Sequence, residues 1–456
     1  MIAGIYERIG NAVSPAWIFL RSRADSLRAC TEIETRRASG EALPLYGVPF
    51  GVKDNIDVAG MPTSAACPAF AYTPAHSARA VELLLQAGAV CLGKTNLDQF
   101  ATGLSGTRSP YGACGSIGNP LYISGGSSSG SAAAVAAGHV AFSLGTDTGG
   151  SGRVPAGFNG IVGIKPTIGR VSTRGLVPNC PTLDCVSIFA TTVDDGMQIL
   201  EIIGSFDADD PFARERPVGG IMDAASASSF RFGVLAPRDL EWSGMPECAG
   251  LYETACERLG HLGGVAVEID FTPFKEAGRM LFDGPWIAER RAAVGPFVDA
   301  HEAELLDVTR TVLRCAGGYD ATAAFAGLHR LATLRRAVKQ QFSSLSALVV
   351  PTAPRPFTIA AMRADPIRLN NQLGYYSYFV NLLDLCAIAV PNGVLECGVP
   401  MGVTLIAPAW AEERLADVAR SFEAQEVDEQ SAAPLAARTQ AQGLRRAAVQ
   451  ATPDRE

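Results

Sequence analysis

Residues 125–152 place two turns rich in glycine and serine on either side of a short apolar stretch. The turns are GGSSSG (125–130) and GTDTGGSG (145–152). Between them, alanine-rich 131–138 predicts a short helix and HVAFSLG (139–145) predicts a strand. A helix of this length and a returning strand bring both turns to the same edge of a sheet, where ligands bind in α/β proteins. This feature therefore predicts an α/β fold with a site at that edge.

Strands and helices alternate from about residue 43 to residue 205, which is typical of a sheet covered by helices on both faces. Further apolar strands are expected at 45–53, 89–94, 230–236, 265–270, 347–354, 387–391 and 401–408. Helices are expected at 15–39, 77–88, 247–262, about 284–316 and 318–343. We expect three parts: an N-terminal helical segment (1–42), a single α/β unit (43–425) and a disordered or frayed tail (426–456).

The overall composition excludes several classes of protein. A net charge of −8 argues against nucleic acid as the main partner, because phosphate binding favours a basic surface. The 11 cysteines include no C-x-x-C pair, which favours reduced thiols in a cytoplasm over disulfides or a zinc site. The start of the chain lacks a secretory apolar region, and the apolar stretch 132–144 is too short to span a bilayer. A soluble cytoplasmic protein is expected, with no membrane partner.

Known nucleotide and hydrolase motifs do not fit the two turns. The first turn has the glycine spacing of a phosphate loop, but Ser131 stands where that motif requires lysine. The dinucleotide fingerprint G-x-G-x-x-G does not follow a strand here. The nucleophile elbow G-x-S-x-G fails because Arg153 follows Gly152. No cofactor and no metal are therefore expected.

Three residues together suggest a different nucleophilic site. Ser151 is displayed on the second turn, but an unassisted serine needs a neighbouring base, and no motif links any of the five histidines to it. Lys53 ends the apolar run GVPFGVK, where burial would lower its pKa and make it a competent base. We expect Lys53 to take a proton from Ser127, Ser127 to take one from Ser151, and Ser151 to attack a carbonyl.

The glycines of the second turn suit the oxyanion that such an attack forms. Backbone N–H groups at Thr148, Gly149, Gly150 and Ser151 can act as its donors, provided that no Cβ blocks the approach. Each residue also has an ordinary explanation when taken alone. Lys53 would then end a strand at the surface, the first turn would be a flexible loop, and Ser151 would have a structural role.

The same residues resemble the amidase signature family. The resemblance runs through GVPFGVKDNIDVAGMPT (47–63), GKTNLDQFATG (93–103) and 125–167 in this order. It implies an α/β fold around a large mixed central sheet and a Ser-cisSer-Lys triad. By position, Lys53 is the base, Ser127 is the bridging serine after a cis peptide bond, and Ser151 is the nucleophile.

Within that family, the chain is more similar to the allophanate hydrolases. The similarity is carried by 66–74, 182–190, 284–292, 369–393 and 402–410. It implies cleavage of the terminal amide of allophanate to ammonia and N-carboxycarbamate, in the cytoplasmic breakdown of urea or cyanuric acid. Arg290 is then expected to pair with the substrate carboxylate, the alternative being a surface arginine on a helix. Where the group has a tyrosine, this chain has Phe282, which removes one hydroxyl from the substrate site.

The sequence is also compatible with other domain contents, functions and assembly states. Many allophanate hydrolases carry a further C-terminal domain, and this sequence leaves no room for one, so we expect an amidase half alone or a shortened chain. An amidase acting on another small amide is one alternative. An accessory subunit that feeds ammonia to a partner in an amidotransferase complex is another. A homodimer is implied by the resemblance only.

Overall fold

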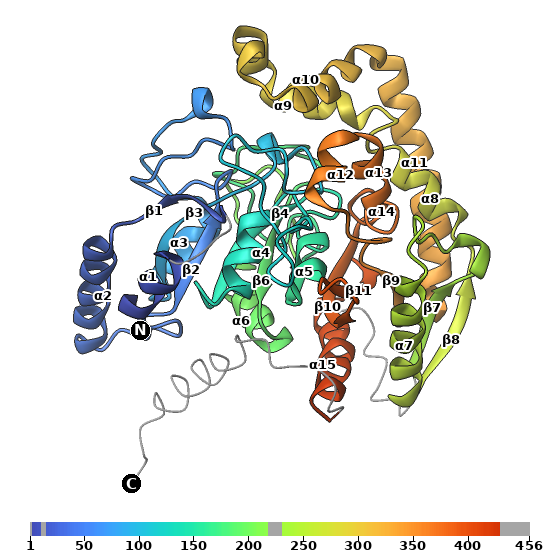
Figure 1. Ribbon diagram of the computed structural model, residues 1–456, viewed down its shortest axis with the longest axis horizontal. Helices are drawn as coiled ribbons and strands as arrows, with labels where there is room; N and C mark the ends of the chain where they lie inside the picture. Colours follow the sequence, from blue (N-terminus) through green and yellow to red (C-terminus); the bar gives the residue numbers. More distant parts are fainter. Residues whose placement is uncertain (1, 11–14, 218–229, 429–456) are drawn as a thin grey trace.

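The computed structural model describes residues 2–10, 15–217 and 230–428 (Figure 1). The strands of this part of the chain form one 11-stranded sheet. They are β1 (Trp17–Leu20), β2 (Pro49–Lys53), β3 (Val90–Thr95), β4 (Phe142–Asp147), β5 (Val162–Lys165), β6 (Cys185–Ala190), β7 (Phe230–Leu235), β8 (Gly264–Ile269), β9 (Ala347–Pro351), β10 (Leu385–Val394) and β11 (Pro400–Pro408).

The sheet is mixed, as the family resemblance implied. Its strand order is β1-β3-β2-β4-β6-β5-β10-β11-β9-β7-β8. Strand β2 runs parallel to β3 and β4, and β7 runs parallel to β8 and β9. The remaining neighbours are antiparallel. The parallel pair β2–β4 matters most for function, because it brings the carboxyl ends of two strands to one edge.

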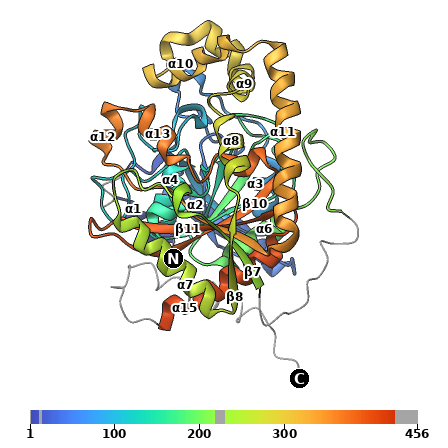
Figure 2. The ribbon, with the colours of Figure 1, turned by 90° about the vertical axis from the view of Figure 1, so that its right-hand side faces the viewer.

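Helices surround the sheet, and several of them cover its two faces (Figures 1 and 2). They are α1 (Ile2–Gly10), α2 (Arg23–Ala38), α3 (Arg79–Gln86), α4 (Ser129–Ala136), α5 (Val154–Asn159), α6 (Val193–Ile203), α7 (Glu247–His261), α8 (Thr272–Arg279), α9 (Trp286–His301), α10 (Asp307–Arg314), α11 (Ala321–Gln341), α12 (Ile359–Ala364), α13 (Arg368–Leu373), α14 (Phe379–Leu382) and α15 (Glu412–Asp428). Helices α3, α6, α7 and α15 share one core with the sheet. Helices α4, α5, α8, α11 and α14 pack on the opposite face.

The alternation of side chains along β2 decides where Lys53 lies. Phe50 and Val52 are fully buried in the core beneath α3 and α6. Because successive side chains of a strand point to opposite faces, Gly51 and Lys53 belong to the face that α4 covers. A Cβ at Gly51 would come 3.1 Å from Ser143 Oγ, so the backbone is closely packed there. The strand therefore delivers Lys53 to the interior.

Some predicted boundaries were wrong. The helix expected at 15–39 is a strand, β1, followed by α2, because Trp17–Leu20 pairs antiparallel with β3 and Ser22 then caps the new helix. The N-terminal segment is thus part of the sheet. The helical stretch 284–316 is divided into α9 and α10. Helix α15 continues to Asp428, and the rest of the predicted tail lies outside the described residues.

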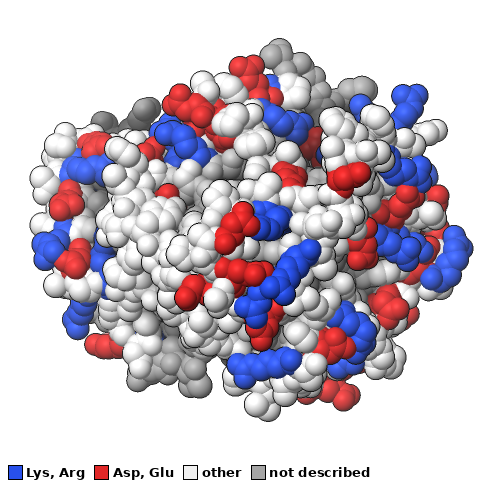
Figure 3. All heavy atoms as spheres, turned by 90° about the horizontal axis from the view of Figure 1, so that it is seen from above, with Lys and Arg blue, Asp and Glu red and all other residues white. Residues whose placement is uncertain are grey.

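Helices α9 and α10 lie at one end of the molecule, beyond the sheet, and α11 runs from that end down the side of the molecule beside α8 (Figures 1 and 2). Basic and acidic side chains are interspersed on the face shown in Figure 3. Within the described residues, no helix has the length and apolarity needed to cross a membrane.

Candidate active site

Three of the predicted residues lie where the carboxyl ends of β2 and β4 meet. Lys53 is the last residue of β2, and Ser127 lies just before α4. Ser151 lies in the turn that joins β4 to α5. Since β2 and β4 are adjacent and parallel, their carboxyl ends share one edge of the sheet. The two glycine- and serine-rich turns thus meet at the predicted edge.

Lys53 and Ser127 form a buried pair. Lys53 Nζ lies 2.7 Å from Ser127 Oγ and 2.6 Å from Thr146 Oγ1. Both Lys53 and Ser127 are fully buried, and the peptide bond between Gly126 and Ser127 is cis. Burial lowers the pKa of Lys53 to about 7, although nearby carboxylates such as Asp98 oppose this shift. A large fraction of this amine is therefore neutral near pH 7 and able to accept a proton.

Ser151 lies at the same edge of the sheet as this pair, and in the described residues it is not hydrogen-bonded to it. Its side chain is 4% exposed, and its hydroxyl donates to the carbonyl oxygen of Gly103 at 3.5 Å. Among the described residues, no hydrogen bond joins Ser127 to Ser151. The predicted link is therefore not made in this state, and catalytic hydrogen bonds are often long or misaligned until substrate binds.

The turn that carries Ser151 is held by a buried ion pair. The Asp147 carboxylate accepts from Gly150 N at 2.8 Å and from Gly152 N at 2.9 Å. It also accepts from Nε and Nη2 of Arg153, each at 2.9 Å. Burial alone would raise the pKa of Asp147, but the charge and hydrogen bonds of Arg153 outweigh it and hold this pKa below its usual value. The pair fixes the turn from within.

These contacts correct one predicted oxyanion donor. The N–H of Gly150 is donated to Asp147, so it is engaged in holding the turn rather than offered to a ligand. In the described structure, the backbone N–H groups of Thr148, Gly149 and Ser151 donate no hydrogen bond. A Cβ at Gly149 would lie 2.5 Å from Leu281 Cδ2, so glycine is needed for the close packing beside these donors.

A small pocket opens beside Ser151, with about 210 Å³ of empty space including its open mouth. Its walls come from the turn after β4, the segment 101–104 and the segment before β6. Helix α9, the residues just before it and the residue before α14 complete the lining. The lining residues are Ala101, Gly103, Leu104, Thr148, Gly149, Ser151, Asn179, Leu281, Phe282, Arg290 and Tyr378.

Arg290 and Phe282, both predicted from the sequence, lie in this pocket. Arg290 is 3% exposed, so it is not a surface arginine. Its guanidinium carbon lies 4.4 Å from the centre of the Phe282 ring. Within the described residues, its buried Nε and Nη1 have no hydrogen-bond partner. Unpaired N–H donors on a buried guanidinium favour an anionic ligand such as a carboxylate.

The hydroxyl missing at Phe282 is not supplied by Tyr375 or Tyr376. Their hydroxyls donate to the carbonyl oxygens of Asp239 and Glu241, each at 2.9 Å, and neither residue lines the pocket. Tyr378 does line it, and its ring centre lies 4.9 Å from that of Phe282. Its hydroxyl is already hydrogen-bonded to Asn370.

Two polar residues next to this site, Asn179 and Asp184, were not predicted from the sequence. Asn179 lines the pocket, and Asp184 is buried behind it. The Asp184 carboxylate accepts from Thr148 Oγ1 at 2.5 Å and from Asn179 N at 2.8 Å. Burial raises the pKa of Asp184 to about 6. For Asn179, the signal in the sequence is a polar residue between two prolines, Pro178 and Pro181. Such a pattern is common in ordinary turns.

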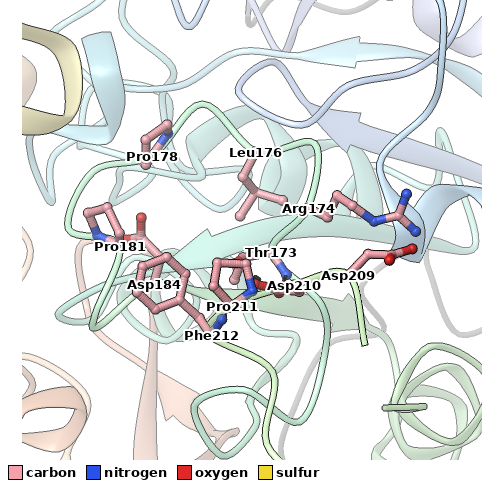
Figure 4. Close-up of a pocket in the computed structure, with 10 residues that line it drawn as sticks. All are labelled: Thr173, Arg174, Leu176, Pro178, Pro181, Asp184, Asp209, Asp210, Pro211 and Phe212. Atoms are coloured by element: carbon pink, nitrogen blue, oxygen red, sulfur yellow. Dashed lines mark hydrogen bonds between the residues drawn. The ribbon is translucent and has the colours of Figure 1, made fainter. Parts of the chain in front are cut away.

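A larger pocket lies beyond Asp184 (Figure 4). Its polar lining is committed to structural contacts: Asp210 accepts from Thr173 N at 2.6 Å, and Arg174 pairs with Asp207 at 3.0 Å. It contains no serine or cysteine beside a base, so the chemistry is better placed in the smaller pocket. In the described part of the chain, no group of three or more histidine, cysteine or acidic residues could hold a metal ion.

Comparison with known proteins identifies the family of this chain. The family model described as Amidase matches residues 1–416. Urea amidolyase of Saccharomyces cerevisiae is 42% identical over 90% of this chain. The match covers only 22% of the length of that protein. The solved structure of Kluyveromyces lactis allophanate hydrolase has 38% identity and a TM-score of 0.89, over 95% of this chain and 71% of that one. A glutamyl-tRNA(Gln) amidotransferase subunit from a Synechococcus species is 35% identical over 89% of this chain and 88% of that protein. The chain belongs to the amidase signature family.

Proposed function

We propose that this amidase hydrolyses allophanate, or a close carboxylated urea, through an acyl-enzyme on Ser151. The observation that carries the proposal is the buried Arg290, whose unpaired donors share a small pocket with Ser151. The similarity to allophanate hydrolase over nearly the whole chain supports the same substrate. The reaction would release nitrogen in the breakdown of urea or cyanuric acid in the cytoplasm.

The proposed chemistry follows from the proton path. Ser151 Oγ adds to the carbonyl carbon of the terminal amide while its proton passes through Ser127 to the neutral amine of Lys53. The N–H groups of Thr148, Gly149 and Ser151 stabilise the oxyanion. The C–N bond then breaks, and the proton returns to the leaving nitrogen, which departs as ammonia. Water adds to the acyl-enzyme along the same path and releases N-carboxycarbamate.

Arg290 supplies the preference for an anionic substrate. A bidentate guanidinium fits a planar carboxylate, and the pair gains strength in a site shielded from water. A neutral amide of the same size would leave the buried guanidinium unpaired. We therefore expect amides that carry a carboxylate close to the scissile bond to be preferred over neutral ones.

Ammonia release from a panel of amides tests the proposal. The panel contains allophanate, malonamate, biuret, an aryl amide and glutamine, each with the wild type and with Ser151→Ala. Allophanate should give the highest kcat/KM, and Ser151→Ala should lower it by about a thousandfold or more. Activity of Ser151→Ala near the wild-type level would refute the acyl-enzyme.

Two arginine variants on the same helix test the substrate contact. Arg290→Gln should lower kcat/KM for allophanate by roughly tenfold to a hundredfold, mainly through KM. Arg291→Gln is the matched control, because Arg291 bonds instead to Gly295 and Asp299 on its own helix. Equal effects of both variants would argue against a carboxylate site at Arg290.

An amidotransferase role is the second candidate, supported by the 35% identity to the Synechococcus amidotransferase protein. In that case glutamine would be the best substrate of the panel, and activity would depend on a copurifying partner. A third outcome, preference for an aryl or other small amide, would keep the Ser151 chemistry and change only the substrate.

A further inference from the structure

Asn179 is held in one orientation by its surroundings. Its side chain is 3% exposed, and its backbone N–H donates to Asp184. Its Nδ2 donates to the carbonyl oxygen of Phe100 at 2.8 Å and to Thr102 Oγ1 at 3.3 Å. A carbonyl oxygen only accepts hydrogen bonds, so the amide nitrogen must face Phe100. The amide oxygen is thereby fixed on the other side.

That oxygen, Asn179 Oδ1, is buried and has no hydrogen-bond partner in the described part of the chain. Buried polar atoms are almost always paired, and an unpaired one in a binding pocket points to a ligand that supplies the partner. Among the side chains that line the pocket beside Ser151, only Asn179 and Arg290 have such unpaired buried atoms in the described structure. Side chains that line this one pocket thus carry two unpaired donors, on Arg290, and one unpaired acceptor, on Asn179.

Asn179 is linked through its neighbours both to the helix that carries Arg290 and to the turn that carries the oxyanion donors. The next residue, Cys180, is hydrogen-bonded to the backbone of α9 at Trp286, one turn before Arg290. On the other side, Asp184 accepts both from Asn179 N and from the side chain of Thr148, at the oxyanion turn. In a carboxylated urea, the group between the carboxylate and the carbonyl is a single N–H.

We propose that Asn179 Oδ1 accepts a hydrogen bond from this internal N–H and so selects a carboxylated urea over its carbon isostere. The inference rests on the proposed function and adds a specificity-determining residue to it. Malonamate is the matching probe, because it keeps the carboxylate and the terminal amide but has CH₂ in place of the N–H. With malonamate the acceptor stays unpaired, and a site built to bond an N–H discriminates strongly against an analogue that lacks it.

The experiment compares kcat/KM for allophanate and malonamate in three proteins. The wild type should prefer allophanate by about tenfold or more. Asn179→Leu, of similar size but with no acceptor, should lower kcat/KM for allophanate by about tenfold to a hundredfold and change malonamate by less than about threefold. Thr102→Val removes one anchor of Nδ2 and keeps Oδ1, so it should preserve the ratio between the substrates.

Each outcome decides the inference. A wild-type ratio near one overturns it without any variant, and this holds even if Asn179→Leu fails to fold. If Asn179→Leu lowers kcat/KM equally for both substrates, Asn179 contacts a group that allophanate and malonamate share, and the inference fails. If the variant lowers neither value, Asn179 does not contact the substrate. Asn179→Ser, a smaller change, repeats the test if thermal unfolding shows that the leucine variant is unstable. Failure of the proposed function looks different: the wild type would then release no ammonia from allophanate while hydrolysing another amide.

Discussion

Replacing Lys53 by methionine should remove a pH dependence from the stability of the protein. The buried amine has a pKa of about 7 in the folded state, against 10.5 as the ordinary value. Between these values the unfolded chain binds more protons than the folded one. Wild-type stability therefore rises with pH across this window and is lost as pH falls towards the folded-state pKa. Methionine has a similar length and does not titrate.

The magnitude follows from the two pKa values. The full separation is 10.5 − 7 = 3.5 units, which corresponds to about 5 kcal/mol in favour of high pH. Over the practical range from about pH 7 to about pH 9, integration of the proton difference gives about 2 kcal/mol. The free energy of unfolding of the wild type should therefore gain about 2 kcal/mol relative to Lys53→Met over this range.

Urea unfolding of both proteins at several pH values measures this difference. Burial raises the pKa of several cysteines, that of Cys91 to about 11, so their ionisation in the unfolded chain adds a pH dependence of its own. That contribution is common to wild type and variant and cancels in the comparison. Lys339→Met is the control, because it makes the same substitution at an exposed position on α11. Parallel curves for the wild type and Lys53→Met would refute the claim that burial keeps the amine neutral. In the wild type, kcat/KM should also rise with pH through about 7.

Three further variants test other parts of the site. Arg153→Met leaves the carboxylate of Asp147 buried without its partner and should lower the free energy of unfolding by about 3–5 kcal/mol in urea titrations. Gly150→Ala places a Cβ at a φ of +131° and 2.4 Å from a neighbouring hydroxyl, so it should cost about 1–3 kcal/mol of stability and lower kcat; an unchanged enzyme would contradict the geometry. Phe282→Tyr returns a hydroxyl to the pocket and should lower KM for allophanate by about twofold to tenfold, whereas an unchanged KM would mean that this hydroxyl meets no substrate atom.

The parts of the site that sequence could predict are those set by local rules. The two turns flank one helix and one strand, so their meeting at a sheet edge follows from connectivity alone. Lys53 ends an apolar run, and burial of the run carries the amine inside. The boundaries of most strands follow from short apolar runs ended by glycine or proline, as at β9 and β11.

The remaining features depend on contacts between distant segments. Strand β1 exists because it pairs with β3. Its four residues, Trp17–Leu20, favour a strand by residue type, but they are too few for their pattern to separate a strand from the start of a helix. The N–H of Gly150 is hydrogen-bonded to the Asp147 carboxylate, and Arg153 sets the orientation of that carboxylate. Arg290 was identified through resemblance rather than through spacing, because it lies far from Ser151 along the chain.

In this fold, the residues proposed for the chemistry and those proposed for substrate specificity come from different parts of the structure. Lys53, Ser127 and Ser151 lie at the ends of strands and at a helix start, where the rigid sheet fixes their positions. Arg290 and Asn179 come from α9 and from the segment before β6, which reach the site only through packing. Changes in the first group should lower kcat for every amide, whereas changes in the second should alter the ratio of kcat/KM between amides. A new substrate could therefore be accommodated by altering the pocket wall while the nucleophile and its base stay as they are.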